Sequence, residues 1–179
     1  MHQTSPLCSI VNANIESLEQ GQQLLKSITL DAYQHRASTI TNSSIGEHFR
    51  HILDMYLALM TGLDSGLVDI NVRRRGAEVE TSPESAMNEI QKIKQWLRSL
   101  DKDSNPEFRL HTEVAISETK SVDIQSHLTR ELIFTSNHAV HHYAIMRIIA
   151  KLQGLEVDDA LGIAAATASN LRNIRRKAS

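Results

Sequence analysis

Apolar residues recur at helical intervals in four separate stretches of the chain. One stretch runs from Ser9 to Ile28 and a second from Ile45 to Met60. A third follows Pro83 as far as about Leu100, and the fourth spans about 125–152. Apolar residues three, four and seven apart form a stripe along one side of a helix, whereas strict alternation would indicate a strand. The pattern therefore predicts four long helices, each with one face to bury.

Capping residues mark the ends of these predicted helices. Ser44 and Glu47 have the spacing of a capping box, in which each side chain accepts a hydrogen bond from the other residue's backbone N–H. Ser82 and Pro83 suit the N-cap and the first helical position, where the missing N–H of proline costs nothing. Gly154 suits the end of the last long helix.

The segments between and after these helices differ in pattern. Residues 29–42 and 63–81 are long, mainly polar connections. Between Phe108 and Ile124 apolar and polar residues alternate, which predicts a small β-hairpin before the last long helix. The C-terminal tail, about 155–179, contains a short helix from about Ala166.

Four apolar stripes in one chain are buried most economically against one another. The chain has 179 residues, of which 41% are hydrophobic, and this is enough for one well-formed core. We therefore expect an all-α fold, a four-helix bundle with long connections, formed by a single domain over residues 1–179.

Charge and cysteine content narrow the function classes. The formal net charge is −2 and the pI is near 6.5, so nucleic acid and anionic membranes have no general electrostatic attraction for this chain. No apolar stretch approaches the ~18 residues of a membrane span, and the N-terminus lacks a signal-peptide pattern. The single cysteine, Cys8, excludes an internal disulfide and suits a reducing compartment. We expect a cytoplasmic protein with no nucleic-acid or membrane partner.

Histidines are concentrated in two of the predicted helices. His138 and His142 are four residues apart and His48 and His51 three apart, so each pair occupies one face of its helix; His141 is a fifth candidate. Several imidazoles inside a helical core are costly unless each finds a partner, and one shared metal ion satisfies them together. Hydrogen-bonded imidazoles without an ion are the alternative. Because free histidine titrates near pH ~6.5, metal affinity is expected to fall below about pH 6.

Charged residues near these histidines each allow two interpretations. Glu131 lies two turns before His138, and Asp54 lies three residues after His51. Each is either a carboxylate that accepts an imidazole N–H or an ordinary surface carboxylate, which for Glu131 is paired near Arg130. Arg73 and Arg75 either clamp a substrate carboxylate by forked hydrogen bonds or form a solvated basic loop.

Two segments of the chain carry motifs built around these histidines: residues 44–54, Ser-Ile-Gly-Glu-His-Phe-Arg-His-Ile-Leu-Asp, and residues 138–143, His-Ala-Val-His-His-Tyr. Together they resemble the DinB-like (YfiT-type) superfamily of metal-binding four-helix bundles. The resemblance covers roughly 43–167 and includes shorter motifs at Val68, Asp69, Arg73, Arg75, Gly76, Glu80, Arg130, Glu131 and Leu161–Ala164.

The resemblance implies a ligand set. The superfamily places one histidine of its second helix and a His-x-x-x-His pair of its last long helix around a divalent metal. Mapped onto this chain, the ligands are His51, His138 and His142. His48 is the runner-up in the second helix, and His141 is the alternative to His142.

The resemblance also implies an activity. Superfamily members include thiol-dependent transferases and isomerases that use small-molecule thiols such as bacillithiol or mycothiol. Three imidazoles with one open position form a catalytic type of zinc site, which activates a thiol or water for transfer, isomerisation or hydrolysis. Imidazole suits several divalent metals, of which zinc or nickel is the cofactor we expect. The alternative is a non-catalytic metal- or ligand-binding helical bundle.

Two further expectations concern positions that depart from the superfamily pattern and the oligomeric state of the chain. Met55 stands where the nearest subfamily has histidine, and Ile70 and Asn71 stand where it has tyrosine and aspartate, so shared substrate contacts are in doubt. Apolar residues on the outer helices (Leu18, Leu25 and Trp96) and the resemblance together predict a homodimer.

Overall fold

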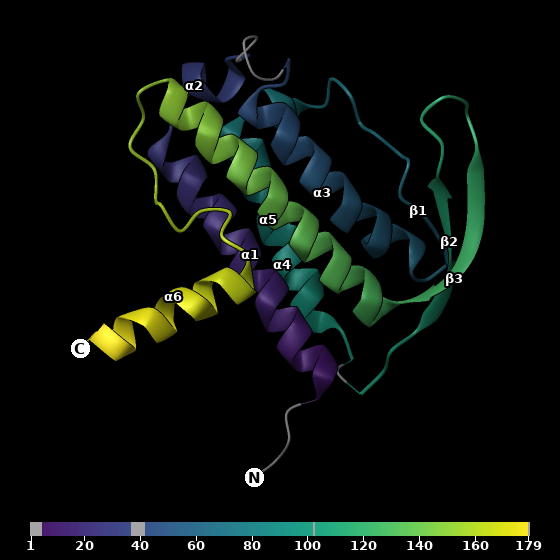
Figure 1. Cartoon of the computed structure of the whole chain (residues 1–179). Helices are drawn as coiled ribbons and strands as arrows, with labels where there is room; N and C mark the ends of the chain where they lie inside the picture. Colours follow the sequence, from purple (N-terminus) through teal and green to yellow (C-terminus); the bar gives the residue numbers. More distant parts are fainter. Residues whose placement is uncertain (1–4, 37–41, 102, 179) are drawn as a thin grey trace.

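The computed structural model describes residues 5–36, 42–101 and 103–178, and it is mostly helical (Figure 1). Its long helices are α1 (Pro6–Ser27), α3 (Ile45–Gly62), α4 (Pro83–Ser99) and α5 (Leu128–Leu152). Shorter helical elements are α2 (Leu30–Gln34), the 3-10 helix η1 (Glu78–Glu80) and α6 (Ala165–Ala178). The strands are β1 (Leu67–Asp69), β2 (Glu107–Glu113) and β3 (Ser121–His127).

Side-chain caps explain where the long helices begin. The capping box is confirmed, because Ser44 N donates to Glu47 Oε2 at 2.7 Å and Glu47 N donates to Ser44 Oγ at 3.1 Å. Ser82 caps α4 as predicted. α1 begins three residues before the predicted stretch, because Ser5 accepts the N–H three residues on and Pro6 occupies the first turn. The spacing of apolar residues cannot reveal a capping residue that lies before the first apolar residue of the helix.

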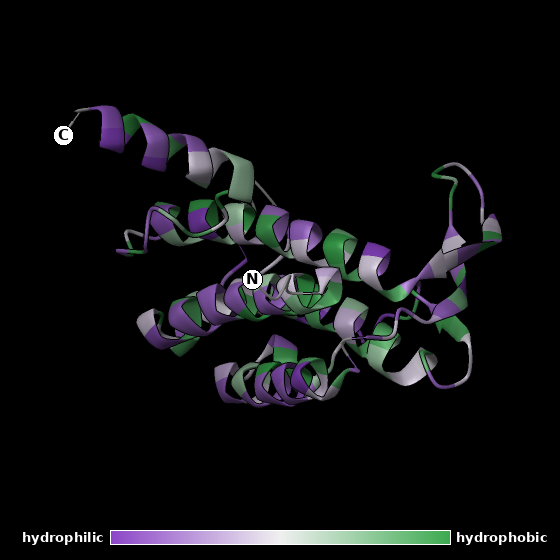
Figure 2. Cartoon of the chain, turned by 90° about the horizontal axis from the view of Figure 1, so that it is seen from below, coloured by the Kyte–Doolittle hydropathy of each residue, from purple (hydrophilic) through white to green (hydrophobic). Residues whose placement is uncertain are grey.

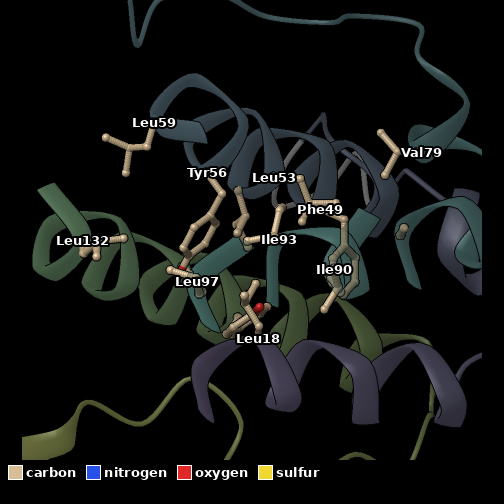
Figure 3. Packing of buried hydrophobic residues seen from close by; sticks show 14 of the residues in the cluster. Leu18, Phe49, Leu53, Tyr56, Leu59, Val79, Ile90, Ile93, Leu97 and Leu132 are labelled. Carbon is tan, nitrogen blue, oxygen red and sulfur yellow. The ribbon is translucent and has the colours of Figure 1, made fainter. Parts of the chain in front are cut away.

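The long helices pack around one core. α1 contacts α4 and α5, and α3 contacts the same two helices (Figure 1). Leu18 of α1, Tyr56 of α3 and Ile93 of α4 are fully buried where these helices meet (Figure 3). A Cβ added at Gly21 of α1 would lie 2.6 Å from the Tyr143 hydroxyl, so the glycine permits close packing on α5. The core therefore fixes α5, which carries part of the candidate site.

A three-stranded sheet in the order β1-β2-β3 lies at one end of the helices (Figure 1). β2 and β3 form the predicted antiparallel hairpin, with Leu110 opposite Ile124. β1 pairs in parallel with β2 and was not predicted, because three residues are too few to show alternation. The chain is thus mostly helical, with more β structure than the expected all-α fold contained.

Several boundaries differ from the predicted ones. α5 begins at Leu128 and not near residue 125, because β3 extends to His127, whose Nδ1 accepts the Arg130 backbone N–H at 3.3 Å. The expected connection at 29–42 contains α2, which Thr29 caps. Residues 37–41 of that connection lie outside the described residues.

The tail contains the predicted helix. α6 begins at Ala165, one residue before the predicted start, and it extends away from the other helices (Figure 1). Its residues are mainly hydrophilic (Figure 2). No helix in the described ranges has both the length and the apolar character needed to cross a bilayer.

The residues expected at a dimer surface are buried or half-buried. Leu18 and Leu25 are buried in the core, and Trp96 is half-buried and packs against it. α5 instead exposes apolar side chains along one face: Ile133, Phe134, Ile148 and Leu152. The homodimer itself stays a prediction.

Candidate metal centre

Two helices in direct contact bring four histidines together. His48 and His51 lie on α3, and His138 and His142 lie on α5. Residues three or four apart share one face of a helix, so each pair faces the other helix. The packing of α3 on α5 therefore also fixes the distance between the two pairs.

The ring nitrogens of three of these histidines converge. Nε2 of His138 lies 2.8 Å from Nε2 of His51 and 3.0 Å from Nε2 of His142. One ligand atom from each of the three residues lies within 4.8 Å of the other two. All three side chains are half-buried. Three nitrogen atoms thus face one small space.

Hydrogen bonds alone do not satisfy this arrangement. A neutral imidazole has one N–H and one lone pair, on different nitrogens. If Nε2 of His138 accepts a hydrogen bond, its single lone pair faces both Nε2 of His51 and Nε2 of His142. If this atom donates, its single proton can be given to only one of these two nitrogens. One contact therefore remains unsatisfied in either tautomer. A cation, in contrast, accepts the lone pairs of all three rings at once.

The spacing suits a divalent ion of the size of zinc. Zn–N bonds of about 2.0–2.1 Å in a tetrahedral site place neighbouring nitrogens about 3.3 Å apart. The observed separations of 2.8 and 3.0 Å are a few tenths of an ångström shorter, so a small movement of the rings admits the ion. Three imidazole ligands leave the fourth position open.

His48 is placed to set the tautomer of His142. Nδ1 of His48 lies 2.9 Å from Nδ1 of His142, while Nε2 of His142 faces the convergence point. When that Nε2 offers its lone pair, the proton of His142 is on Nδ1, and it is donated to His48. His48 then carries its own proton on Nε2, a buried atom that has no hydrogen-bond partner among the described residues. Metal-binding histidines commonly have such an acceptor behind them.

Burial keeps these imidazoles neutral. It lowers the pKa of His51 to about 4, with the nearby Arg73 guanidinium as the next cause, and the pKa of His142 to about 3. Burial also lowers the pKa of His48 and of His138. A neutral imidazole is the form that binds metal. These lowered pKa values move the pH at which protons are expected to compete with metal from about 6, as for free histidine, toward about 4.

Glu131 does not contact the cluster. Its buried carboxylate accepts hydrogen bonds from Ser126 Oγ at 2.5 Å and from Arg130 Nη1 at 2.6 Å, and it thereby links β3 to α5. Seven residues along a helix is about 10.5 Å, which is too far to reach the His138 ring. The interpretation of Glu131 as an imidazole partner was therefore wrong. Its expected pairing with Arg130 is confirmed, but the carboxylate is buried and not on the surface.

Asp54 is also buried, and it anchors the connection between α3 and α4. It accepts hydrogen bonds from the backbone N and the Nε of Arg74, at 3.1 and 2.6 Å. Arg50 Nη1 lies 3.4 Å from the same carboxylate. The Arg74 guanidinium also donates two hydrogen bonds of 2.8 Å to Glu89 on α4. Asp54 therefore positions the arginine-bearing segment, which neither interpretation from the sequence foresaw.

The structure separates the alternative ligands. His141 is exposed, and its ring centroid lies 5.4 Å from that of His142 without a hydrogen bond between them. His48 reaches the cluster only through its contact with His142. The histidines that the structure brings together are those of the predicted ligand set: His51, His138 and His142. Sequence analysis missed the contact between His48 and His142, for which the spacing on α3 was the only signal.

A cavity of about 640 Å³ opens beside this cluster. His48, His51 and His142 line it. Charged side chains form most of the rest of the wall, which Ser43 and Gly76 complete: Arg36, Glu47, Arg50, Arg75 and Glu80. A cavity of this size accommodates a small molecule within reach of the converging nitrogens.

Comparison with known proteins does not assign the chain to a family. No protein-family model matches the chain, and no solved structure matches it. The chain is 28% identical over 107 residues to FK506-binding protein 5 of Rhizopus delemar. The match covers 59% of this chain and 28% of that protein, so the chain corresponds to under a third of the fungal protein's length. This similarity does not show a family, and functional inference therefore starts from the histidine cluster.

Proposed function

We propose that His51, His138 and His142 bind one divalent metal ion, zinc or nickel, with an open coordination position. The observation that carries the proposal is the convergence of their Nε2 atoms, which hydrogen bonds alone do not satisfy. We further propose that the chain is a metal-dependent enzyme with the four-helix-bundle fold of the DinB-like superfamily. The sequence resemblance and the packing of α1, α3, α4 and α5 support that assignment.

When bound, such an ion lowers the pKa of a coordinated water or thiol and so supplies a nucleophile near neutral pH. The chain's own residues prepare the site. Burial keeps the ligand imidazoles neutral, and His48 holds the Nδ1 proton of His142. The Phe134 ring stacks on His138 with centroids 5.9 Å apart, and it shields that ligand from solvent. The adjoining cavity gives a substrate access to the open position.

The proposed substrate is a small molecule, and the proposed co-substrate is a low-molecular-weight thiol in the cytoplasm. Thiol transfer or isomerisation is preferred over hydrolysis because the resembling superfamily uses thiols. This part of the proposal rests on the resemblance alone.

A non-catalytic metal- or ligand-binding bundle is the second candidate. One observation favours it: no carboxylate in the described part of the chain hydrogen-bonds to the four clustered histidines, since Glu131 and Asp54 are engaged elsewhere. The two glutamates of the adjoining cavity, Glu47 and Glu80, are paired with Arg36 and Arg50, so the site lacks an obvious general base of its own.

Thiol-dependent turnover separates the two candidates. Zinc- or nickel-loaded protein, purified without a histidine tag, is assayed for thiol consumption with a panel of electrophiles. The enzyme proposal predicts turnover that chelation abolishes and that His142→Ala loses. The exposed neighbour supplies the control, because His141→Ala should retain turnover. Full metal occupancy without turnover on any electrophile would favour the non-catalytic bundle.

A further inference from the structure

Three consecutive arginines between α3 and α4 differ in what they contact. Arg74 is tied to Asp54 and Glu89 by side-chain hydrogen bonds of 2.6 to 2.8 Å. The side chain of Arg73 donates to two backbone carbonyls. Arg75 is exposed, and it makes no hydrogen bond or ion pair with any residue that the structure describes. Of the three, Arg74 alone is paired directly with carboxylates that the structure describes.

The backbone on either side of Arg75 is held in a turn. Ala77 N donates to Arg74 O at 2.9 Å, and Gly76 has a φ of 78°, as the third residue of a type II turn requires. Gly76 N donates to Glu80 Oε2 at 3.0 Å. The turn is thus anchored before and after Arg75, so this side chain extends from a fixed backbone position.

The cavity beside the histidine cluster has one unpaired cation in its wall. Two of the three arginines that line it form ion pairs with its two glutamates: Arg36 with Glu47 at 2.6 Å, and Arg50 with Glu80 at 2.9 Å. Arg75 is the third arginine, and it has no such partner in the described ranges. The wall therefore presents a single positive charge to whatever enters the cavity.

We propose that the Arg75 guanidinium binds the carboxylate of a small-molecule substrate whose reacting group lies at the metal centre. This inference rests on the proposed function and adds the substrate class. A guanidinium fork matches a carboxylate through two parallel hydrogen bonds, and one carboxylate balances one unpaired charge. A phosphate dianion would leave excess negative charge beside Glu47 and Glu80, so the site favours a carboxylate. Two attachment points orient the substrate for reaction.

Two thiols that differ only at the far end of the molecule test this inference. Mercaptopropionate and mercaptopropanol present the same thiol to the metal, but only the first carries a carboxylate. Calorimetric titration of zinc-loaded protein should give mercaptopropionate about tenfold tighter binding, a modest factor because Arg75 is exposed. Arg75→Gln should remove this advantage and leave the affinity for mercaptopropanol unchanged.

Two variants control for charge. Arg98→Gln removes one positive charge from an exposed position outside the cavity wall, and it should keep the tenfold preference. Arg75→Lys keeps the charge but loses the fork, and it should keep only part of the preference. Equal affinities of the two thiols for the wild type, or a preference that survives Arg75→Gln, would overturn the inference.

A thiol-free probe distinguishes failure of this inference from failure of the metal proposal. Propionate is titrated into metal-free protein and followed by NMR, with Arg75→Gln and Arg98→Gln alongside. Weak propionate binding that is lost in Arg75→Gln but kept in Arg98→Gln supports the carboxylate site, whether or not the histidine cluster binds metal. Propionate binding that does not depend on Arg75, or binding of inorganic phosphate in preference to propionate, would contradict it.

Discussion

Replacement of His48 tests the proposed role of its contact with His142. In the metal-bound state, Nδ1 of His142 carries a proton, and its acceptor is Nδ1 of His48 at 2.9 Å. His48→Leu removes the acceptor and leaves that N–H buried without a partner, which costs about 1–3 kcal/mol. The metal-free protein avoids this cost, because His142 can move its proton to the other nitrogen. The penalty therefore falls on metal binding.

The expected result is a zinc affinity reduced about 10- to 100-fold in His48→Leu. His48→Gln, whose amide oxygen can accept the same proton, should recover most of the loss. Metal-free His48→Leu should unfold at no lower urea concentration than the wild type, because the substitution removes a buried polar atom that lacks a partner. Competition with a chromophoric chelator measures the affinity.

Two results would refute this reasoning. An unchanged zinc affinity in His48→Leu would show that the contact does not set the tautomer of His142. Complete loss of zinc from His48→Leu, together with retention in His51→Ala, would show that His48 and not His51 is the ligand from α3.

Four further predictions follow from burial and packing. Histidine in the unfolded chain binds protons below about pH 6.5, whereas buried His51 stays neutral down to about pH 4. The unfolding free energy of the metal-free protein should therefore fall as pH is lowered between these values, and a urea stability that does not change over this range would contradict this. Over the same range zinc affinity should fall only gradually, and a steep loss at about pH 6 by chelator competition would count against the lowered pKa values. Asp54→Ala should lower the unfolding free energy by about 3 kcal/mol, because it leaves Arg74 and Arg50 without this carboxylate; a loss below about 1 kcal/mol in urea would disagree. The exposed apolar face of α5 predicts a homodimer, which sedimentation at micromolar concentration would exclude if it found only a 20.0 kDa species.

Much of the helical structure could be predicted because it depends on local signals. Apolar spacing, together with the caps at Ser44 and Ser82, located all four long helices to within three residues. α2 and β1 were missed because elements of five and three residues are too short to show a period. Leu18 was misplaced at a surface because a helical stripe does not reveal which neighbour covers it.

The candidate site was predictable in part for the same reason. His138 and His142 share a helix, so their spacing alone places them together, whereas the choice between His48 and His51 required knowing how α3 lies on α5. Glu131 was misassigned because residues on one helix face can still be too far apart along its axis. The role of Asp54 depends on its contact with Arg74, and the place of Arg75 in the cavity wall depends on how this segment lies against α3. No local pattern encodes either arrangement.

The metal content of protein purified without a histidine tag tests the central claim most directly. Elemental analysis and zinc titration are compared for the wild type, His142→Ala and His141→Ala. The account predicts about one divalent ion per chain in the wild type and in His141→Ala, whose ring lies outside the convergence point, and loss of most of the metal in His142→Ala. Equal stoichiometry and affinity in all three proteins, or no bound metal in the wild type after incubation with zinc, would contradict a three-histidine metal site.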